Sequence, residues 1–433
     1  MRVLLVQAVS APFTGELVYP LGLARLARVL AGRHQLAGMD LNLDPHPWPA
    51  LAARLEDFRP QAVCISFRNL DPLAGNHVSW LPQLQVLARL VRRHRPRALV
   101  IAGGPGFSLF ARRLMAEVPE LDLGVAGEAE QVLPALLQDP AGPPYPAGVL
   151  YRRDGALAGG GMSHLPECRR LPSPDWGLFP LGPYRRRNRY VAFMGVESKR
   201  GCPHRCSYCL YPVLQGGRVR LRSPRRVLDE LESLQKEQGL ELVHFTDPVL
   251  NQPAAHLRAL CRGMLERGLT LKWTGFFRED TLTPADLDLY QRAGLAAVYF
   301  SADGASAQAL ALLNKGLEPE QILAAARLVA RRKILAVYHF LVNLPGENRR
   351  TVDQGRRLLE TIMDIHQRHH APPSMVFNNL RLYPGAPLTR RLLEQGLIPP
   401  DQDLLYPCYY NPPPWDGLRY QWEALCLGRQ VGA

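Results

Sequence analysis

Apolar residues along the chain fall into short runs separated by amphipathic stretches, and this alternation occurs in two series. In the first series, the apolar runs predict strands at residues 3–6, 35–43, 62–67, 98–102 and 121–126. Between these runs, apolar side chains recur at helical spacing at Leu23, Leu26, Ala27 and Leu30, and again at Leu84, Leu87, Ala88 and Val91. Strands that alternate with helices predict a parallel, doubly wound α/β sheet over residues 1–138.

A second alternating series runs from about residue 190 to residue 395. Its predicted strands lie at residues 190–196, 241–246, 271–276, 296–301, 334–342 and 374–380. Two of the helices between them should begin at Pro224, after the cap residue Ser223, and at Pro284, after Thr283. Six strands in strict alternation predict a partial (β/α)6 barrel rather than a second open sheet.

The segments outside the two series are irregular. Residues 139–189 lose the apolar period and accumulate Pro, Gly and Arg, which predicts a linker with one small hairpin around residues 153–155. After Pro387 we expect one helix and then a tail, residues 396–433, that is rich in Pro, Tyr and Trp. The tail should anchor itself on the barrel, although its aromatic side chains could instead pack on a substrate.

Charge and length restrict the class of protein. The 433 residues include 52 Lys and Arg against 39 Asp and Glu, a net charge of +13 that invites a nucleic-acid partner. Only five of these basic residues are lysine, and the arginines are scattered through predicted helices, which does not favour a phosphate-binding face. No apolar run is long enough to cross a membrane and the N-terminus does not have a signal-peptide pattern, so we expect a cytoplasmic protein with reduced thiols.

The clearest chemical feature is a group of three cysteines, Cys202, Cys206 and Cys209, directly after the first strand of the second series. Eight cysteines in the whole chain are too few for a disulfide scaffold. Zinc sites and structural iron–sulfur clusters normally take four protein ligands, and no second cysteine pair is present. Three thiolates on one loop would leave one iron of a [4Fe–4S] cluster open to a substrate or cofactor.

This Cys-x3-Cys-x2-Cys loop, with Tyr208 before its last cysteine, resembles that of the radical S-adenosylmethionine (SAM) superfamily. The second series is similar to that superfamily's partial barrel. The resemblance implies a [4Fe–4S] cluster on the three cysteines and SAM contacts from Tyr208, Thr246, Asp247, Arg278, Ser301, Asp303 and Asn343. Asp303 stands where the family branch usually has glutamate, and Asp303 and Arg278 could instead be structural ion-pair partners within the barrel.

The first series resembles the cobalamin-binding domain that one branch of this superfamily carries at its N-terminus. Parallel sheets bind ligands at the carboxyl ends of their strands, where glycines allow close approach and a serine hydroxyl can bond a cofactor nitrogen. The resemblance implies cobalamin contacts from Ser66, Arg68, Asn69, Gly103, Gly104, Pro105, Gly127 and Glu128.

The segment after the first strand, residues 10–15, lacks the histidine that ligates cobalt in many cobalamin enzymes. His77 and Trp80 could approach the cobalt instead, although a solvated histidine and a packed tryptophan are the simpler interpretation.

By resemblance, the chain is a cobalamin-dependent radical SAM enzyme that methylates an unactivated carbon of a small natural-product or cofactor-type molecule. The reaction would use a 5′-deoxyadenosyl radical and methylcobalamin, with electrons from a donor of the flavodoxin or ferredoxin type. Cyclisation or rearrangement without methyl transfer is an alternative in the same architecture.

RNA modification is a competing hypothesis, because tRNA methylthiotransferases share the cysteine loop. Those enzymes carry three more N-terminal cysteines and usually a C-terminal RNA-binding barrel. This chain has only Cys64 and Cys168 before the loop, and fewer than 50 residues after Pro387. A non-catalytic cobalamin carrier would have no need of the loop.

Overall fold

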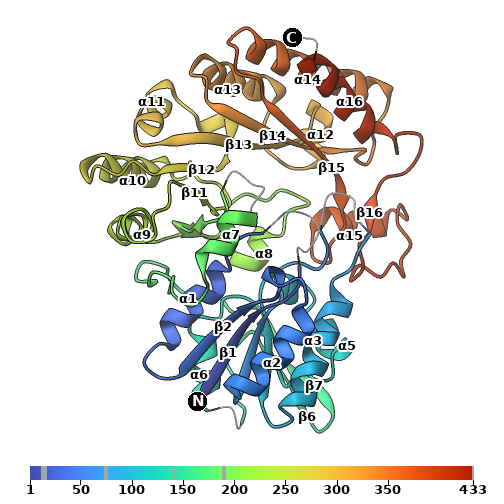
Figure 1. Ribbon diagram of the computed structural model, residues 1–433. Coiled ribbons are helices and arrows are strands. Elements are labelled where there is room, and N and C mark those ends of the chain that lie inside the picture. Colours follow the sequence, from blue (N-terminus) through green and yellow to red (C-terminus); the bar gives the residue numbers. More distant parts are fainter. Residues whose placement is uncertain (11–16, 73–76, 140–141, 188–191, 432–433) are drawn as a thin grey trace. The chain divides into compact units, whose positions relative to one another are not determined.

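The N-terminal series forms a seven-stranded sheet in the order β2-β1-β3-β4-β5-β6-β7, seen in a computed structural model that describes residues 1–10, 17–72, 77–139, 142–187 and 192–431 (Figure 1). Its parallel strands are β1 (Arg2–Gln7), β2 (Gln35–Asp40), β3 (Ala62–Ser66), β4 (Leu99–Gly103) and β5 (Leu123–Val125). β2 ends earlier than the apolar pattern predicts. The reason is that the Asp40 side chain accepts a hydrogen bond from the Asn42 amide and so starts the 3-10 turn η1 (Leu41–Leu43).

Helices flank this sheet, and the pattern of apolar residues predicted only two of them. Those two are α1 (Leu21–Leu30) and α3 (Leu81–His94). The others are α2 (Pro47–Phe58), α4 (Pro105–Leu109), α5 (Ala111–Glu117), α6 (Val132–Gln138) and α7 (Leu181–Arg187). α2 escapes the pattern because only Leu51 and Leu55 of its twelve residues are buried.

Residues 142–187, the described part of the segment 139–189 that was expected to be a linker, contain more regular structure than their composition indicates. The expected hairpin is present as β6 (Val149–Arg153) and β7 (Ala156–Gly159), and β6 pairs antiparallel with β5, so the hairpin extends the N-terminal sheet. By its contacts, the first structural unit continues to Gly195. The buried residues of this segment are spaced irregularly among Pro and Gly, which hides them from a search for periodicity.

The second series forms a sheet in the order β8-β11-β12-β13-β14-β15-β16. Its first six strands are β8 (Gly195–Val196), β11 (Leu242–Phe245), β12 (Lys272–Phe277), β13 (Leu295–Asp303), β14 (Leu335–Val342) and β15 (Ser374–Arg381). β11 to β15 are parallel and consecutive, which is the topology of the predicted partial barrel. Of the strand expected at residues 190–196, residues 190 and 191 lie outside the described residues.

Helices follow the barrel strands in the expected alternation (Figure 1). The main ones are α9 (Pro224–Lys236), α10 (Ala254–Glu266), α11 (Pro284–Arg292), α13 (Pro319–Arg331) and α14 (Arg349–Gln367). α9 and α11 begin at the predicted prolines, and the Thr283 hydroxyl accepts a hydrogen bond from the Asp286 amide, as a helix cap does.

The C-terminal tail is anchored on the barrel. β16 (Tyr409–Tyr410) pairs antiparallel with β15 after the expected helix α15 (Pro387–Glu394). A second helix, α16 (Leu418–Val431), was not expected. It buries Trp422, whose ring centroid lies 5.8 Å from that of Phe377 on β15. Contacts of this kind, between residues far apart in the chain, have no local sequence pattern.

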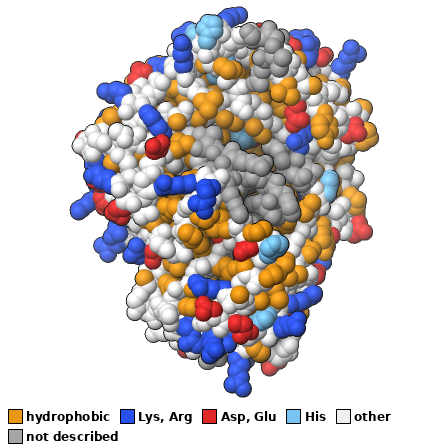
Figure 2. All heavy atoms as spheres, viewed as in Figure 1, with side chains coloured by type: hydrophobic (Ala, Val, Ile, Leu, Met, Phe, Trp, Pro, Cys, Tyr) orange, Lys and Arg blue, Asp and Glu red, His pale blue; other side chains and the backbone are white. Residues whose placement is uncertain are grey.

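Charged side chains are spread over the surface. Figure 2 shows Lys and Arg side chains distributed over the visible face with acidic side chains between them. The excess of positive charge is therefore not gathered into one broad face in this view. Within the described residues, no helix combines the length and the apolar character needed to cross a membrane.

Candidate functional site

The three cysteines lie on the loop between β9 (Lys199–Arg200) and α8 (Tyr211–Gln215). Cys202 is buried, whereas Cys206 and Cys209 are partly exposed, and the thiols are near enough to interact electrostatically. Among the described residues, no three His, Cys, Asp or Glu side chains converge on one point as the ligands of a single ion would. A [4Fe–4S] cluster is held by Cys thiolates that each bind a different iron, and the three thiols of this loop are donors of that kind.

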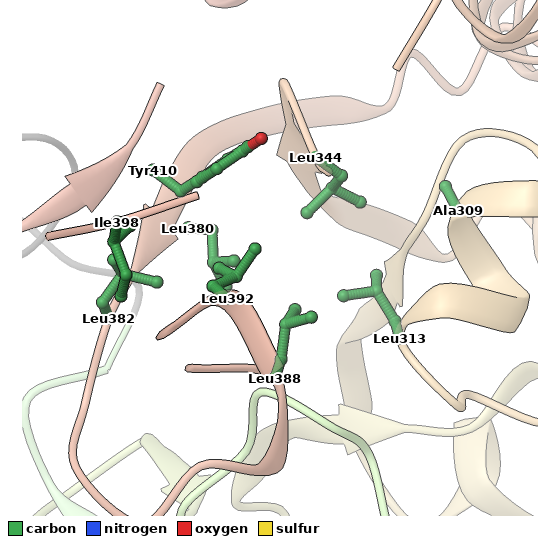
Figure 3. Packing of buried hydrophobic residues seen from close by; sticks show 9 residues of the cluster. All are labelled: Ala309, Leu313, Leu344, Leu380, Leu382, Leu388, Leu392, Ile398 and Tyr410. Carbon is green, nitrogen blue, oxygen red and sulfur yellow. The ribbon is translucent and has the colours of Figure 1, made fainter. Parts of the chain in front are cut away.

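Ser207 lies between Cys206 and Cys209 and holds the loop in place through its hydrogen bonds. It is buried, its amide donates to the Leu313 carbonyl at 2.9 Å, and its hydroxyl donates to the Leu312 carbonyl at 2.9 Å. Its own carbonyl accepts a hydrogen bond from the Leu388 amide at 2.8 Å. Leu313 and Leu388 belong to the apolar core shown in Figure 3, against which Tyr208 also packs. The loop backbone is thus clamped by α12 (Ala307–Leu312) and α15.

The side chain of Asp247, which was predicted to contact SAM, binds Ser198 and Lys199, the residues that lead into the cysteine loop. Its carboxylate accepts hydrogen bonds from the Ser198 amide at 2.8 Å and from the Ser198 hydroxyl, and it pairs with the Lys199 ammonium at 3.4 Å. Burial lowers the pKa of Lys199, while Asp247 acts against that shift. The carboxylate therefore positions the loop entrance, and its contact with SAM stays a prediction.

Asp303 and Tyr208, each predicted to contact SAM, contact one another. The Asp303 carboxylate accepts a hydrogen bond from the Tyr208 hydroxyl and another from the Lys315 ammonium at 2.8 Å. Burial and the nearby Asp303 raise the pKa of Tyr208, so its hydroxyl stays a neutral donor. Burial opposes the charge on Lys315, but Asp303 outweighs it and the pKa of Lys315 is raised. Lys315 was not predicted, because it lies 12 residues after Asp303 and the helix α12 separates the two in the sequence.

Arg278 is a structural ion-pair partner within the barrel, which was the alternative to SAM binding that the sequence left open. Its guanidinium forms a two-point pair with Asp280, at 3.0 and 2.8 Å. It also donates to the Lys315 carbonyl at 2.9 Å and to the Gly316 carbonyl at 3.1 Å. Arg278 therefore holds the backbone of Lys315 in place, and its contact with SAM stays a prediction.

The remaining predicted SAM residues stand at three barrel strand ends. Thr246 is exposed after β11, and Ser301 is partly exposed near the end of β13. The Asn343 amide donates to Asn411 at 2.7 Å and to the Pro412 carbonyl at 2.8 Å, so this side chain ties down the tail. The Thr246 hydroxyl donates to the Val196 carbonyl at 3.4 Å, yet Thr246 and Ser301 both remain accessible to solvent, whereas the Asn343 amide is occupied by the tail.

The electrostatic surroundings of the thiols suit a bound metal cluster. Burial raises the pKa of Cys209 to about 12, and it also raises the pKa values of Cys202 and Cys206. For Cys202 and Cys206, the cations of Lys315 and Arg278 act in the opposite direction. Cluster ligands are thiolates, so the cations of Lys315 and Arg278 favour the ligand form of Cys202 and Cys206, whereas burial opposes it at all three cysteines.

Glu279, which no sequence motif indicated, is buried beside this group. Neither of its carboxylate oxygens has a hydrogen-bond partner from another described residue. Burial raises the pKa of Glu279 to about 7, although Lys315 acts against that shift. The carboxyl thus titrates near neutral pH.

In the N-terminal unit, backbone hydrogen bonds join two of the loops that were predicted to bind cobalamin. Ser66 and Gly103 are partners across β3 and β4, and the Gly106 amide donates to the Arg68 carbonyl at 2.8 Å. Gly104 has a φ of +100°, and a Cβ there would come within 3.0 Å of the Phe67 carbonyl oxygen. These glycines are therefore required by the packing of the chain itself.

Ser108 links these loops to the third predicted cobalamin segment and was missed by sequence reasoning. Its hydroxyl donates to the Gly104 carbonyl at 2.8 Å and accepts from the Gly127 amide at 2.9 Å. The neighbouring Glu128 carboxylate accepts a hydrogen bond from the Leu165 amide, so it secures residues after the hairpin. The carboxyl edge of the sheet is rigid and polar, which fits a bulky cofactor.

The other predicted cobalamin residues are accessible. Arg68 and Pro105 are exposed and Asn69 is half-buried at this edge. His77 is exposed and Trp80 is buried, which agrees with the simpler interpretation of both residues. Of the segment at residues 10–15, only Ser10 lies within the described residues.

A barrel with a three-thiol loop and a parallel sheet with a polar carboxyl edge are the features expected of a radical SAM protein that carries a cofactor-binding α/β domain. Comparison with family models agrees, since residues 196–359 match the radical SAM superfamily and residues 13–137 match the B12 binding domain. The chain is therefore a radical SAM protein of the branch with a B12-binding domain. These matches confirm the predicted family, fold class and cofactor set at the level of domains.

Similar proteins include both methyltransferases and a cyclase. The chain is 25% identical to an uncharacterized methyltransferase of Pyrococcus horikoshii, over 88% of this chain and 79% of that protein. It is 28% identical to the anaerobic magnesium-protoporphyrin IX monomethyl ester cyclase of Cereibacter sphaeroides, over 61% of this chain but only 44% of the cyclase. Among solved structures, the methyltransferase TsrM of Kitasatospora setae, with tryptophan and a SAM analogue bound, superposes with a TM-score of 0.77 at 23% identity, over 91% of this chain and 76% of that chain.

Proposed function

We propose that this chain is a cobalamin-dependent radical SAM enzyme that methylates an unactivated carbon of a small natural-product or cofactor-type molecule. The observation that carries the proposal is a clamped three-thiol loop on the barrel, in a chain that also holds a matched B12-binding domain. When bound, the cofactors supply one-electron cleavage of SAM and a transferable methyl group. The protein's task is to hold and aim them.

Each group of residues has a distinct task in this proposal. Cys202, Cys206 and Cys209 would hold the cluster. The exposed hydroxyls of Thr246 and Ser301 would bind SAM, beside the carboxylate of Asp303 that the Tyr208 and Lys315 side chains orient. Asp247, Arg278 and Asn343 would act through the segments that they hold, since their polar groups already have partners.

The N-terminal unit would bind cobalamin at the carboxyl edge of its sheet. Polar groups for the task come from Ser66, Arg68 and Asn69 after β3, and backbone groups come from the Gly103, Gly104 and Pro105 turn after β4. Gly127 and Glu128 would keep the neighbouring loop in place, the first through Ser108 and the second through Leu165.

Relatives support methyl transfer to a small molecule without identifying it. They include a cytidylyl-2-hydroxyethylphosphonate methyltransferase of Streptomyces wedmorensis and a hopanoid C-3 methylase of Methylococcus capsulatus, whose substrates are chemically unrelated. Cyclisation without methyl transfer remains the second candidate, because two anaerobic cyclases also match this chain. We further propose a cytoplasmic location, where thiols stay reduced, and an electron donor of the flavodoxin or ferredoxin type.

Reconstitution with iron, sulfide and cobalamin under anaerobic conditions, followed by turnover with methyl-labelled SAM and dithionite as the electron source, tests the proposal. We expect iron–sulfur and cobalamin absorbance, formation of 5′-deoxyadenosine, and label in a product when tryptophan, a hopanoid and magnesium-protoporphyrin IX monomethyl ester are offered. A changed product without label would favour the cyclase alternative, and failure to bind cobalamin would overturn both. Cys206→Ala should abolish the iron–sulfur absorbance, whereas the control Cys261→Ala, a buried thiol on α10, should retain it.

A further inference from the structure

The segment that contains the cysteine loop is free of acidic residues. Between Ser198 and Val227 there is no Asp or Glu. The same segment contains eight basic residues: Lys199, Arg200, Arg205, Arg218, Arg220, Arg222, Arg225 and Arg226. The chain as a whole has 39 acidic residues to 52 basic ones, so this local imbalance is far greater than the average.

These eight residues divide into two sets. Lys199, Arg200, Arg220 and Arg222 are buried, and three of them pair with acids: Lys199 with Asp247, Arg200 with Glu197, and Arg222 with Glu230. Arg205, Arg218, Arg225 and Arg226 are exposed. Within the described residues, no acidic side chain forms an ion pair with any of these four guanidinium groups.

The exposed arginines lie close along the chain to the partly exposed thiols. Arg205 precedes Cys206, which is partly exposed. β10 (Arg220–Leu221) pairs antiparallel with β9, with Arg220 opposite Arg200, so Arg218 lies beside the start of the cysteine loop. Arg225 and Arg226 occupy the first turn of α9, a few residues further on (Figure 1).

Apolar side chains stand among these arginines. Tyr211, directly after the loop at the start of α8, is 41% exposed, and Leu221 is 37% exposed. Exposed apolar side chains in the same segment as exposed charges are a combination found on surfaces that bind another protein. Solvated arginines alone would not need exposed apolar neighbours.

We propose that this loop-side surface, made of Arg205, Arg218, Arg225, Arg226, Tyr211 and Leu221, docks an acidic electron-carrier protein of the flavodoxin or ferredoxin type. The inference rests on the proposed function, which places an iron–sulfur cluster on the loop. In the docked complex one electron passes from the reduced carrier to the cluster. The carrier is oxidised by one electron, the cluster is reduced by one, and no bond forms or breaks.

Charge and position favour this occupant over RNA. Arginine cations steer an acidic carrier to the surface, and long-range steering mainly raises the rate of association. The surface is built on the same loop as the partly exposed thiols, so docking there brings the carrier's redox centre toward the cluster. RNA would also be attracted by the cations, but RNA binding has no need of a surface next to the thiols.

The experiment measures cluster reduction rather than methylation. The reconstituted full chain is mixed with reduced flavodoxin in a stopped-flow instrument, and bleaching of the iron–sulfur absorbance is followed. For the variant Arg218→Glu/Arg225→Glu/Arg226→Glu, we expect the second-order rate constant to fall by roughly tenfold or more, because steering is lost. With sodium dithionite, which needs no docking, the variant and the wild type should be reduced equally fast. Raising the salt concentration should slow reduction of the wild type by flavodoxin.

A control with the same change in net charge separates docking from overall charge. Arg262 on α10, Arg327 on α13 and Arg350 on α14 are also exposed and distant in sequence from the loop. The variant Arg262→Glu/Arg327→Glu/Arg350→Glu should be reduced by flavodoxin at nearly the wild-type rate. The fold should tolerate the test variant, because glutamate in the first turn of α9 suits the helix dipole.

Three outcomes would overturn the proposal. Equal rates for both triple variants would show that the loop-side surface is not the docking site. Slower reduction by dithionite as well would show that the arginines maintain the loop rather than bind a partner. Loss of tRNA binding in the test variant, with the flavodoxin rate unchanged, would assign the surface to RNA. If the proposed function alone fails, the wild type will still be reduced by flavodoxin but will transfer no labelled methyl group.

Discussion

The cysteine loop of the barrel and the glycine-rich edge of the N-terminal sheet are positioned by different interactions. Around the cysteine loop, two buried ion pairs, Asp247–Lys199 and Asp303–Lys315, act beside the hydrogen bonds that Ser207 makes. At the sheet edge, backbone hydrogen bonds join neighbouring loops, and glycines permit the close approach. The barrel site should therefore be sensitive to loss of charge, and the sheet edge to any added side-chain atom.

The largest effect is expected from Asp303→Ala. This change would leave the buried Lys315 ammonium without its partner, and breaking a buried ion pair in this way costs about 3 to 5 kcal/mol. Urea unfolding of the apo protein measures the loss. The double variant Asp303→Ala/Lys315→Met should recover much of it, because the unpaired charge is gone. If the single variant unfolds like the wild type, charge pairing does not hold this region.

Glu279→Gln should stabilise the barrel at alkaline pH. Burial raises the pKa of Glu279 from 4.5 to about 7, so the folded state keeps this proton longer than the unfolded state. Stability from this group is therefore full below pH 4.5 and declines as pH rises toward 7. The resulting difference is roughly 3 kcal/mol, from about 1.4 kcal/mol for each pKa unit. Unfolding at pH 8 and pH 5 measures it, and a glutamine variant with equal gains at both pH values would contradict the assigned pKa.

Gly104→Ala tests the sheet edge. The left-handed backbone and the contact with the Phe67 carbonyl should cost about 1 to 3 kcal/mol and weaken cobalamin binding. Equilibrium titration with cobalamin, alongside urea unfolding, provides the measurement. Gly32→Ala is a suitable control, since Gly32 also has positive φ but no atom lies near its added Cβ. Equal cobalamin affinities in the two variants would show that close approach at Gly104 does not matter.

The smallest effects should come from two serines with parallel roles. Ser207→Ala and Ser108→Ala each remove side-chain hydrogen bonds to the backbone, worth about 1 kcal/mol per bond. Ser207→Ala should lower iron content after reconstitution while leaving cobalamin binding intact. Ser108→Ala should do the reverse. A variant that lowers both cofactors equally would indicate a general loss of stability rather than a local role.

Local patterns along the chain explain which features could be predicted. The buried parallel strands and the three cysteines depend on residues close together in the sequence, and both were predicted. The hairpin at residues 149–159 was found, but its attachment to β5 was not, because pairing across a sheet has no local pattern. For the same reason α16, whose buried Trp422 packs on Phe377, was missed.

The residues missed at the sites have partners far along the chain. Ser207 bonds backbone groups of α12 and α15, and Lys315 meets Asp303 only after the turn between them closes. Asn343 stands at a strand end, as a cofactor ligand would, yet the tail occupies its amide. A polar residue at a strand end can thus be predicted to lie near a site. Whether its hydrogen-bond partner is a cofactor or another part of the chain depends on the tertiary structure.

The short strand β16 also covers an edge of the barrel sheet. An open sheet has two edges, and an uncovered edge offers unpaired amide and carbonyl groups to other chains. Tyr409 and Tyr410 cover part of β15 at the barrel's last edge, and Asn411 is tied there by both Asn343 and Asn379. A shortened chain that ended at residue 395 would keep the cysteine loop and all parallel strands. It would nevertheless expose the edge of β15 and should self-associate.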